Sequence, residues 1–257
     1  MENCFFFSKW KKSRSFFVHG LKRSGNHAVI NWLMGHNSFN FYNNVIPVGA
    51  ILCGTFKQPE PVPYKTWIQE QNGELGSKKK LNIVSFEDNH LDNGRFTDRP
   101  ENLINIIILR SPENLFSSRI KKAGKIEHPC YPDHKNEYMN KVIEMWKEHA
   151  RECLGQTNVL ENSVCVLYDL WYTNEAYRKE LSSKLGFKFS DKNFSKIADF
   201  GGGSSFSGNK IDSNESINVL NRSNNLNEKE LALLNEILED GTLNKLYVEL
   251  VEKVNSC

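Results

Sequence analysis

Residues 15–30 read SFFVHGLKRSGNHAVI, and this stretch decides the fold. Its apolar first half predicts a buried strand, and HAVINWLM at 27–34 predicts a helix. Between them, Gly20 and Gly25 have the GxxxxG spacing of a phosphate-binding loop, in the place where such a loop belongs. The backbone N–H groups of this kind of turn and the positive end of the following helix attract an anion. The stretch therefore predicts a strand, loop and helix that together bind an anionic group.

The rest of the chain repeats this alternation of apolar runs and helical patterns. The expected strands are 15–21, 81–86, 102–109 and 163–168. The expected helices are 27–34, 111–122, 134–154, 173–186 and 227–253, the last broken near Gly241. Because the strands are almost continuously apolar, both faces of their sheet must be covered. The pattern predicts an α/β fold, a three-layer sandwich with a central parallel β-sheet and a P-loop-like loop.

The length of the chain favours one large core. At 257 residues we expect a single domain over 1–257. Three long stretches, 37–80, 123–135 and 187–226, are rich in proline, glycine or polar residues and predict irregular structure. Loops of this length in a compact domain are commonly functional. We expect them to be insertions that cap the site or bind a substrate.

The composition excludes several classes of protein. A formal net charge of +2 is too slight to indicate a nucleic-acid partner, and no run of about 18 apolar residues suits a membrane span. Lysines interrupt the N-terminal 17 residues, which therefore lack the apolar core of a signal peptide. Six cysteines without a CxxC pair favour reduced thiols, and His128 and His134 beside Cys130 lack zinc-site spacing. We expect a soluble, cytoplasmic protein without a metal.

The charges of the loop argue against an ordinary nucleotide-binding loop. A Walker loop ends in Gly-Lys-Ser/Thr, but here Gly25 is followed by Asn26 and His27. The positive charge lies earlier, at Lys22 and Arg23. A sulfuryl group attached to a phosphate suits this arrangement, because its in-line displacement leaves negative charge that a fixed cation stabilises. On the loop alone, a glycine-rich turn with solvated cations is an equal alternative.

A second motif, IIILRSPENLFSSR at 106–119, supports the anion-binding interpretation. Arg110 ends a buried strand, where ligands collect in open α/β sheets, and its guanidinium suits a phosphate monoester. Ser118 follows in the helix that Ser111 caps and Pro112 begins, on the same face as Ser111. The alternatives are a salt-bridged strand end for Arg110 and a helix-surface serine for Ser118.

Together these motifs resemble the sulfotransferase family that uses 3′-phosphoadenosine 5′-phosphosulfate (PAPS). GLKRSGNHAVINWL is similar to the family's 5′-phosphosulfate loop, whose commonest forms are Pro-Lys-Ser-Gly-Thr and Pro-Arg-Ser-Gly-Thr. IIILRSPENLFSSR is similar to its 3′-phosphate motif, in which a serine follows an arginine eight positions later, as Ser118 follows Arg110. The resemblance implies PAPS as donor, 3′,5′-adenosine bisphosphate (PAP) as product, and no metal.

The resemblance also implies roles for individual residues. Arg23 falls where the family's cation contacts the bridging oxygen and the leaving phosphate, and Lys22 replaces the usual proline. Arg110 and Ser118 would bind the 3′-phosphate. The backbone donors to the 5′-phosphate would come from Ser24, Gly25, Asn26 and His27. Since Asn26 and His27 replace two threonines, the usual hydroxyl contacts must be remade or lost.

A weaker resemblance continues downstream. SVCVLYDLWYTNEAYRKELSSKLGF, at 163–187, is similar to the family's strand, turn and helix that place a tyrosine, here Tyr168, near the adenine. The glycine-rich DFGGGSSFSGNK would close over the nucleotide, with Gly203, Ser204 and Ser205 meeting the 3′-phosphate. A disordered linker is the alternative for this segment.

The catalytic base is expected after the strand LNIVSF, where the family places a histidine or a glutamate. Glu87 comes first in alignment, and His90 has the better intrinsic pKa. If the chain turns at Asp88 and Asn89, His90 points back or away. We place Glu87 ahead of His90, and solvated loop residues are the alternative for both.

We therefore expect a sulfotransferase that passes the sulfuryl group to a hydroxyl or amine of a small-molecule or glycan acceptor. The alternatives are a P-loop nucleotide kinase and a non-catalytic module that binds adenosine bisphosphates or another anion. Neither the acceptor nor the oligomeric state can be read from the sequence. Candidate acceptor-lining residues, each of a type that also fills cores or solvated surfaces, are Phe39, Phe41, Tyr42, Trp67, Tyr131, Lys121, Lys122 and Lys125.

Overall fold

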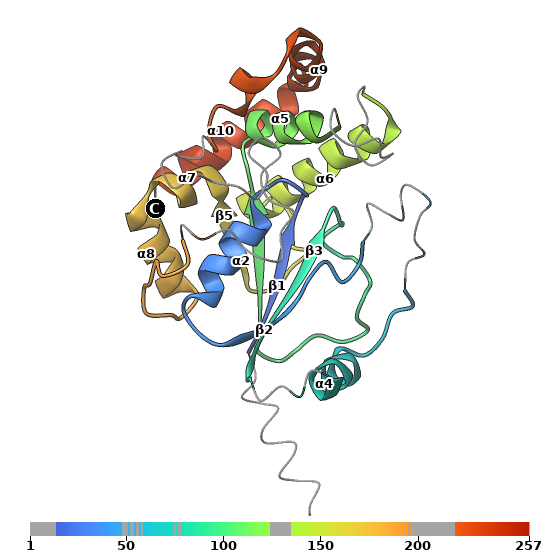
Figure 1. Ribbon diagram of the computed structural model, residues 1–257, viewed down its shortest axis with the longest axis vertical. Coiled ribbons are helices and arrows are strands. Elements are labelled where there is room, and N and C mark those ends of the chain that lie inside the picture. The colour runs from blue at the N-terminus through green and yellow to red at the C-terminus, as the bar shows by residue number, and fades with distance from the viewer. Residues whose placement is uncertain are drawn as a thin grey trace, which may run out of the picture.

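A five-stranded, all-parallel sheet forms the centre of the molecule (Figure 1). The computed structural model describes residues 14–47, 51, 54, 57, 59–74, 76, 79–123, 135–194, 196 and 219–256. The strands are β1 (Arg14–Gly20), β2 (Phe39–Tyr42), β3 (Leu81–Glu87), β4 (Leu103–Leu109) and β5 (Ser163–Leu167). Their order in the sheet is β2-β3-β1-β4-β5.

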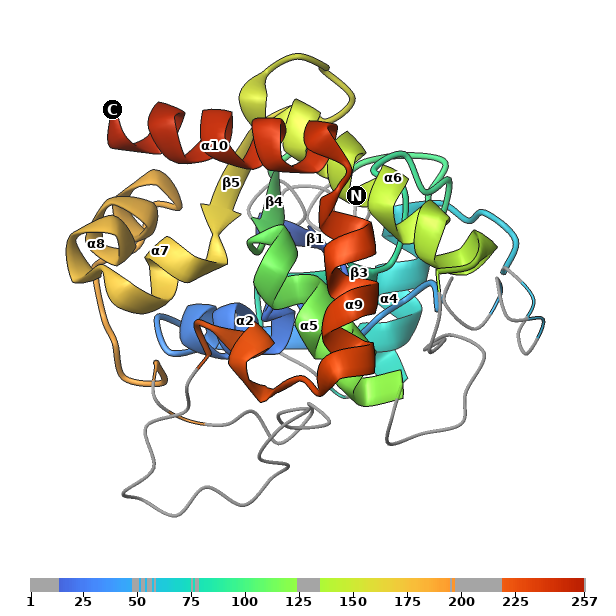
Figure 2. The same ribbon diagram turned by 90° about the horizontal axis from the view of Figure 1, so that it is seen from above.

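Helices cover both faces of this sheet, as Figures 1 and 2 show. One face carries α2 (Asn26–Met34), α7 (Tyr168–Thr173) and α8 (Glu175–Lys184). The other carries α4 (Tyr64–Glu74), α6 (Glu137–Leu154) and α10 (Gly241–Asn255), while α5 (Pro112–Ala123) packs against α9 (Glu228–Leu238). The predicted α/β class with helices on both sides of a parallel sheet is therefore confirmed.

The alternation of side chains along β1 and β4 divides the core. Phe16 and Val18 face α2, whereas Phe17 faces α4. Ile106 points toward α2, and Ile107 points toward α5 and α6. Buried on both faces, these strands have the near-continuous apolar sequence that parallel sheets require.

The sheet changes direction at β1, which lies between β3 and β4. In register, Gly20 pairs with Glu87 on one side and with Ile108 on the other. The carboxyl ends of β1, β3 and β4 therefore meet at one edge of the sheet. In open α/β sheets, ligands bind outside the carboxyl ends of the strands at such a switch point.

The stretch 37–80 is not irregular throughout, so that prediction was wrong. It contains β2 and α4. A single turn of helix, the 3-10 helix η1 (Arg222–Asn225), also lies inside 187–226. Both β2 and α4 depend on tertiary contacts, since β2 is four residues long and α4 buries Tyr64, Trp67 and Ile68 against the sheet. Local sequence signals are weakest for such elements.

Other boundaries follow the sequence closely. Helix α2 ends before Gly35, α5 begins at Pro112, and the C-terminal helical stretch is interrupted at Glu239 and Asp240. The turn expected after β5 is the short helix α7, which begins at Tyr168.

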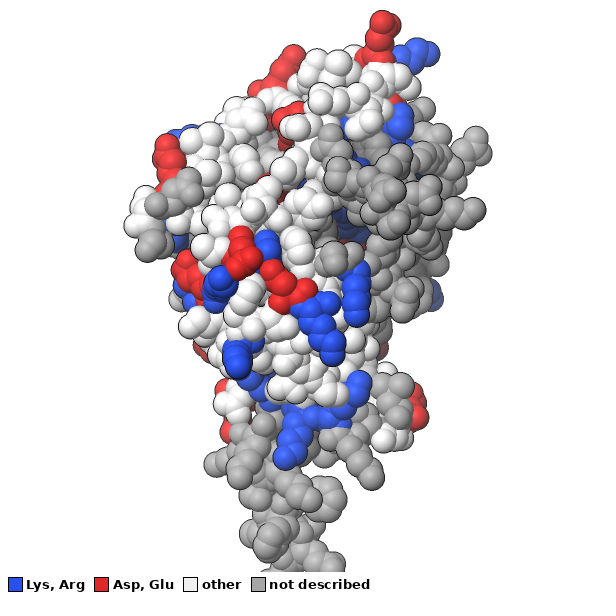
Figure 3. All heavy atoms as spheres, turned by 60° about the vertical axis from the view of Figure 1, so that its left-hand side comes forward, with Lys and Arg blue, Asp and Glu red and all other residues white. Residues whose placement is uncertain are grey.

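The surface around α8 mixes both signs of charge (Figure 3). Two lysine–glutamate pairs, Lys179 with Glu175 and Lys184 with Glu180, lie on this helix, and the two residues of each pair are one helical turn apart.

Among the described helices, none has the length and apolarity needed to cross a bilayer. Within the same residues, no cluster of three or more His, Cys, Asp or Glu side chains suits a metal ion. Cys153 and Cys165 are free thiols there.

Candidate functional site

The loop after β1 forms a tight turn that leads into α2, and no side chain caps the N-terminus of this helix. Ser24 N–H donates to Leu21 O at 3.0 Å, and the chain takes positive φ at Arg23 (+77°) and Gly25 (+89°). Gly25 is the N-cap of α2 and supplies no side-chain cap. The first N–H groups of a helix have no acceptor within it, and a helix end of this kind attracts an anion.

Both loop glycines are required by close contacts. A Cβ on Gly25 would stand 2.1 Å from the ring of Tyr168, and a Cβ on Gly20 would stand 2.2 Å from Asn26 Oδ1. Tyr168, at the start of α7, thus lies directly against the loop. The Ser24 hydroxyl, also in this turn, is fully buried and has no hydrogen-bond partner among the described residues.

A buried carboxylate that the sequence analysis did not single out holds the loop. Asp88 Oδ1 accepts the N–H of Lys22 at 2.9 Å, and the Asp88 N–H donates to Gly20 O at 3.1 Å. Asp88 also pairs with Arg119 and accepts the Tyr138 hydroxyl at 2.9 Å. Burial alone would raise the pKa of Asp88, but Arg119 and then Lys22 hold it below its ordinary value. In the sequence, the signal that could have pointed to Asp88 is its position directly after the buried strand β3.

Glu87 lies beside the loop. Its Oε1 accepts Asn26 Nδ2 at 3.0 Å, and the same amide group donates to Leu21 O at 3.1 Å. The Glu87 N–H donates to Asn44 Oδ1, and its carbonyl accepts Asn89 Nδ2. The side chain of Asn26 therefore bridges the loop to β3, and the half-buried carboxylate of Glu87 stands at the edge of the loop.

His90 points elsewhere. Asp88 has a φ of +55°, which turns the chain, and His90 Nδ1 pairs with Glu148 Oε2 of α6 at 2.5 Å. The His90 side chain is 66% exposed. Among the described residues, Glu87 bonds to Asn26 at the end of the loop, whereas His90 bonds to Glu148 of α6.

Arginine side chains gather on the other side of the loop. Arg110, directly after β4, is 5% exposed and donates to Arg23 O at 3.1 Å and to Ser118 Oγ at 3.5 Å. Its guanidinium lies 5.1 Å from the centre of the Tyr168 ring, and burial lowers the pKa of Arg110. The sequence-predicted pair Arg110 and Ser118 is thus brought to the loop.

Arg222, in η1, is a third arginine that sequence reasoning missed. Burial first, and then the charges of Arg110 and Arg23, lower the pKa of Arg222 to about 10. Its N–H donates to Asn114 Oδ1 at 2.9 Å, and Asn114 Nδ2 lies 3.3 Å from Asp169 Oδ1. We call Arg23, Arg110 and Arg222 the arginine cluster. Like charges brought together under burial cost free energy unless anions lie among them, and one carboxylate, that of Asp169, pairs with this cluster at 4.0 Å from Arg110 Nε.

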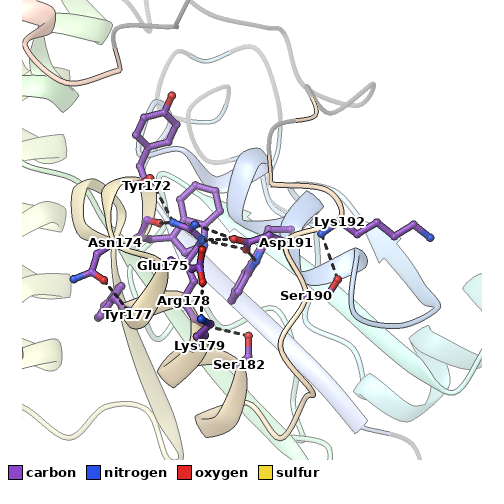
Figure 4. Close-up of polar contacts among 12 residues, drawn as sticks. Tyr172, Asn174, Glu175, Tyr177, Arg178, Lys179, Ser182, Ser190, Asp191 and Lys192 are labelled. Atoms are coloured by element: carbon purple, nitrogen blue, oxygen red, sulfur yellow. Dashed lines mark hydrogen bonds and ion pairs between the residues drawn. The ribbon is translucent and has the colours of Figure 1, made fainter.

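A network on α8 fixes the aromatic side of the site (Figure 4). Arg178 binds Asp191 through Nε and Nη2, at 3.1 and 2.8 Å, and donates to Trp171 O at 2.8 Å. Asp191 also accepts Trp32 Nε1 of α2 at 2.9 Å. Tyr172 points away from this pair in Figure 4, and its ring stacks on that of Tyr168 at 6.2 Å. The network thereby ties α7, which carries both tyrosines, to α2.

The remaining predicted residues differ in where they lie. His27 is half-buried and its Nε2 donates to Asn43 Oδ1 at 3.1 Å. Lys22 is half-buried at the loop. Of the predicted acceptor-lining residues, Phe39, Tyr42 and Trp67 fill the core. Predicted residues that lie outside the described ones are Lys125, Tyr131, Gly203, Ser204 and Ser205.

No family model and no curated protein matches the sequence. The solved structures that are similar to the chain include two sulfotransferase domains and one mouse sulfotransferase. Mouse sulfotransferase SULT7A1 complexed with PAP is 13% identical, with 92% of this chain and 88% of that chain covered and a TM-score of 0.47. The sulfotransferase domain of the Synechococcus PCC 7002 olefin synthase is 11% identical (94% and 94% covered, TM-score 0.41). The sulfotransferase domain of the curacin biosynthetic pathway is 13% identical (93% and 98% covered, TM-score 0.47).

Proposed function

We propose that the chain is a PAPS-dependent sulfotransferase that transfers a sulfuryl group to a hydroxyl or amine. The observation that carries the proposal is the arginine cluster beside an uncapped helix N-terminus. Arg110 and Arg222 are each 5% exposed, Arg110 donates to the carbonyl of Arg23 just before α2, and the charges of Arg110 and Arg23 lower the pKa of Arg222. A ligand with more than one anionic group offsets this repulsion.

The residues present fit the two anionic ends of PAPS. The phosphosulfate end suits the first N–H groups of α2, together with the buried, unpartnered hydroxyl of Ser24. The 3′-phosphate suits the guanidinium of Arg110, with Ser118 beside it and Arg222 nearby. The rings of Tyr168 and Tyr172 supply a flat apolar surface close by for the adenine.

In the proposed transfer reaction, Arg23 acts on the leaving group and Glu87 acts on the attacking group. PAPS supplies an activated sulfuryl group when bound. Arg23 would stabilise the charge that develops on the bridging oxygen. On the opposite side, Glu87 would accept the proton of the attacking hydroxyl or amine. Asn26, which holds Glu87 Oε1, would orient that carboxylate toward the loop.

The two alternatives have less support. A nucleotide kinase would need a lysine at the end of the loop, where Asn26 instead turns its amide toward Leu21 and Glu87. The aspartate after β3 that could hold magnesium, Asp88, is bound to Arg119 and Tyr138. A non-catalytic anion-binding module would leave Glu87 without a role beside the loop.

The test is a ligand comparison followed by a transfer assay. PAP is expected to raise the melting temperature, because a ligand that binds the native state stabilises it, whereas ATP with magnesium is expected to raise it less. Radiolabelled PAPS should then transfer its label to an acceptor mixture. Stabilisation by ATP with magnesium alone would overturn the proposal, and PAP binding without any transfer would favour the non-catalytic module.

A further inference from the structure

The acceptor side of the loop has a composition that indicates a substrate class. Resting on the proposed function, we propose that the acceptor is a carbohydrate and that the attacking group is a sugar hydroxyl. The residues concerned are Glu87, His27 and Asn43, which we call the acceptor wall. They come from the end of β3, the first turn of α2 and the segment after β2.

Hydrogen bonds join the members of this wall. Asn43 Oδ1 accepts from His27 Nε2 at 3.1 Å and from Ser85 Oγ at 3.3 Å. The next residue, Asn44, accepts the Glu87 N–H at 3.1 Å. His27 and Asn26 are neighbours on α2, and Asn26 holds Glu87 at 3.0 Å. Hydrogen bonds thus join Asn43 to His27 of α2 and hold residues 43 and 44 against β3, which ends at Glu87.

The wall still has hydrogen-bonding groups to offer. The Asn43 side chain is exposed, and its amide nitrogen donates to no described residue, which leaves two N–H donors. The Asn26 amide donates to Glu87 Oε1, and Oε2 accepts no hydrogen bond from the described residues. A sugar presents adjacent hydroxyls, each of which donates and accepts. The Glu87 oxygen can accept from one such hydroxyl, and the Asn43 amide can donate to another.

Apolar surface, which a phenol or steroid acceptor needs, is missing from the described part of this wall. The exposed large apolar side chains of the described residues are Val159, Leu231 and Val248, which lie after α6, on α9 and on α10. Nearer the wall, Phe41 and Val45 are half-buried and pack against the core clusters. Sites for flat apolar ligands are lined mainly by apolar and aromatic groups. The polar wall favours the sugar.

The reaction then balances without a further reactant. The sugar hydroxyl oxygen forms a bond to sulfur as the bond from sulfur to the bridging phosphate oxygen breaks. The hydroxyl proton passes to Glu87, and the electron pair of the broken bond stays on the phosphate of PAP. The product is a sugar sulfate ester.

The test compares two acceptor panels with PAPS as donor. The carbohydrates are lactose, N-acetyllactosamine and N-acetylglucosamine, and the apolar acceptors are 4-nitrophenol and oestradiol. Transfer to at least one carbohydrate, with kcat/KM at least tenfold above that for either apolar acceptor, is expected. No transfer to any carbohydrate, or a preference for an apolar acceptor, overturns the inference. A PAP-induced thermal shift in the same preparation, together with transfer to any acceptor of either panel, shows separately whether the proposed function stands.

A substitution tests the wall itself. Asn43→Leu should lower kcat/KM for the carbohydrate at least tenfold while the KM for PAPS stays within twofold. Asn43→Gln, which keeps the amide, should recover part of the loss. Asn158→Leu is the matched control, since Asn158 is exposed in the loop before β5. Equal activity of Asn43→Leu and Asn158→Leu contradicts the assignment of the wall.

Discussion

The Asp88 carboxylate accepts the backbone N–H of Lys22 at 2.9 Å while the Asp88 N–H donates to Gly20 O at 3.1 Å. Asp88, the residue after β3, thus forms hydrogen bonds with both ends of the segment from Gly20 to Lys22. Positive φ at Asp88 and at the neighbouring loop cation Arg23 costs about 1–2 kcal/mol each, and such strain persists only where the surroundings enforce it. We call these two hydrogen bonds of Asp88 the clamp, and they hold the backbone next to Arg23 in place.

Asp88→Asn is expected to destabilise the protein by about 3–5 kcal/mol, because it leaves the buried charge of Arg119 without its partner. Urea unfolding measures this loss. Glu175→Gln, which breaks an exposed pair with Lys179, is the control and should cost at most about 1 kcal/mol. Asp88→Asn combined with Arg119→Gln should recover part of the stability. A loss no larger than that of the control would show that the clamp is dispensable.

Gly25→Ala is expected to damage both folding and PAP binding, since the added methyl group would meet the Tyr168 ring at 2.1 Å at a positive φ. Gly94→Ala provides a matched control, because Gly94 also has a positive φ (+63°) but open space around it. The control should lose about 1–2 kcal/mol from strain alone. Gly25→Ala should lose about 1–3 kcal/mol more from overpacking. Equal melting temperatures for the two variants would argue against the contact.

Arg222→Ala is expected to raise the Kd of PAP about tenfold to a hundredfold, which corresponds to the loss of one charge-assisted hydrogen bond. Isothermal titration calorimetry measures the change. Arg99→Ala, at an exposed position, removes the same charge away from the cluster and should leave the Kd within twofold. If both variants bind PAP equally well, Arg222 is not part of the anion site.

Glu87→Gln is expected to lower the transfer rate about a hundredfold or more while PAP affinity stays within twofold. Glutamine keeps an acceptor for Asn26 Nδ2 but loses the basicity of the carboxylate. His90→Ala should retain most activity, because His90 pairs with Glu148. Loss of turnover in the His90 variant alone would reverse the assignment of the base.

Acid should destabilise the fold through His19. Burial first, and then the charge of His149, lowers the pKa of His19 to about 3 from 6.5. Between these values the unfolded chain binds a proton that the folded chain does not, so stability falls as pH falls, by up to about 1.4 kcal/mol per unit. In His19→Gln, urea unfolding between pH 6 and 4 should show a slope smaller by that amount. Parallel curves for the two proteins would contradict this cause.

The local pattern was sufficient for the strands that meet at the loop from Gly20 to Gly25. Apolar runs predicted β1, β3, β4 and β5, and the family resemblance implied the pair Arg110 and Ser118, which lie 3.5 Å apart in the structure. The short strand β2 and helix α4 escaped prediction because their stability comes from packing against β1 and β3. Glu87 was chosen over His90 by sequence position, and the turn at Asp88 gives a geometric reason for the same choice.

By itself, the sequence determined the α/β class and the loop from Gly20 to Gly25, because strand hydrophobicity and glycine spacing are local properties. Only the tertiary structure decided that Arg222 approaches Arg110 and that Asp88 clamps Lys22. These contacts join residues more than 60 positions apart, and the order of strands in the sheet brings them together. The polar surface at Asn43 has the same origin, since β2, α2 and β3 converge there only in the folded chain.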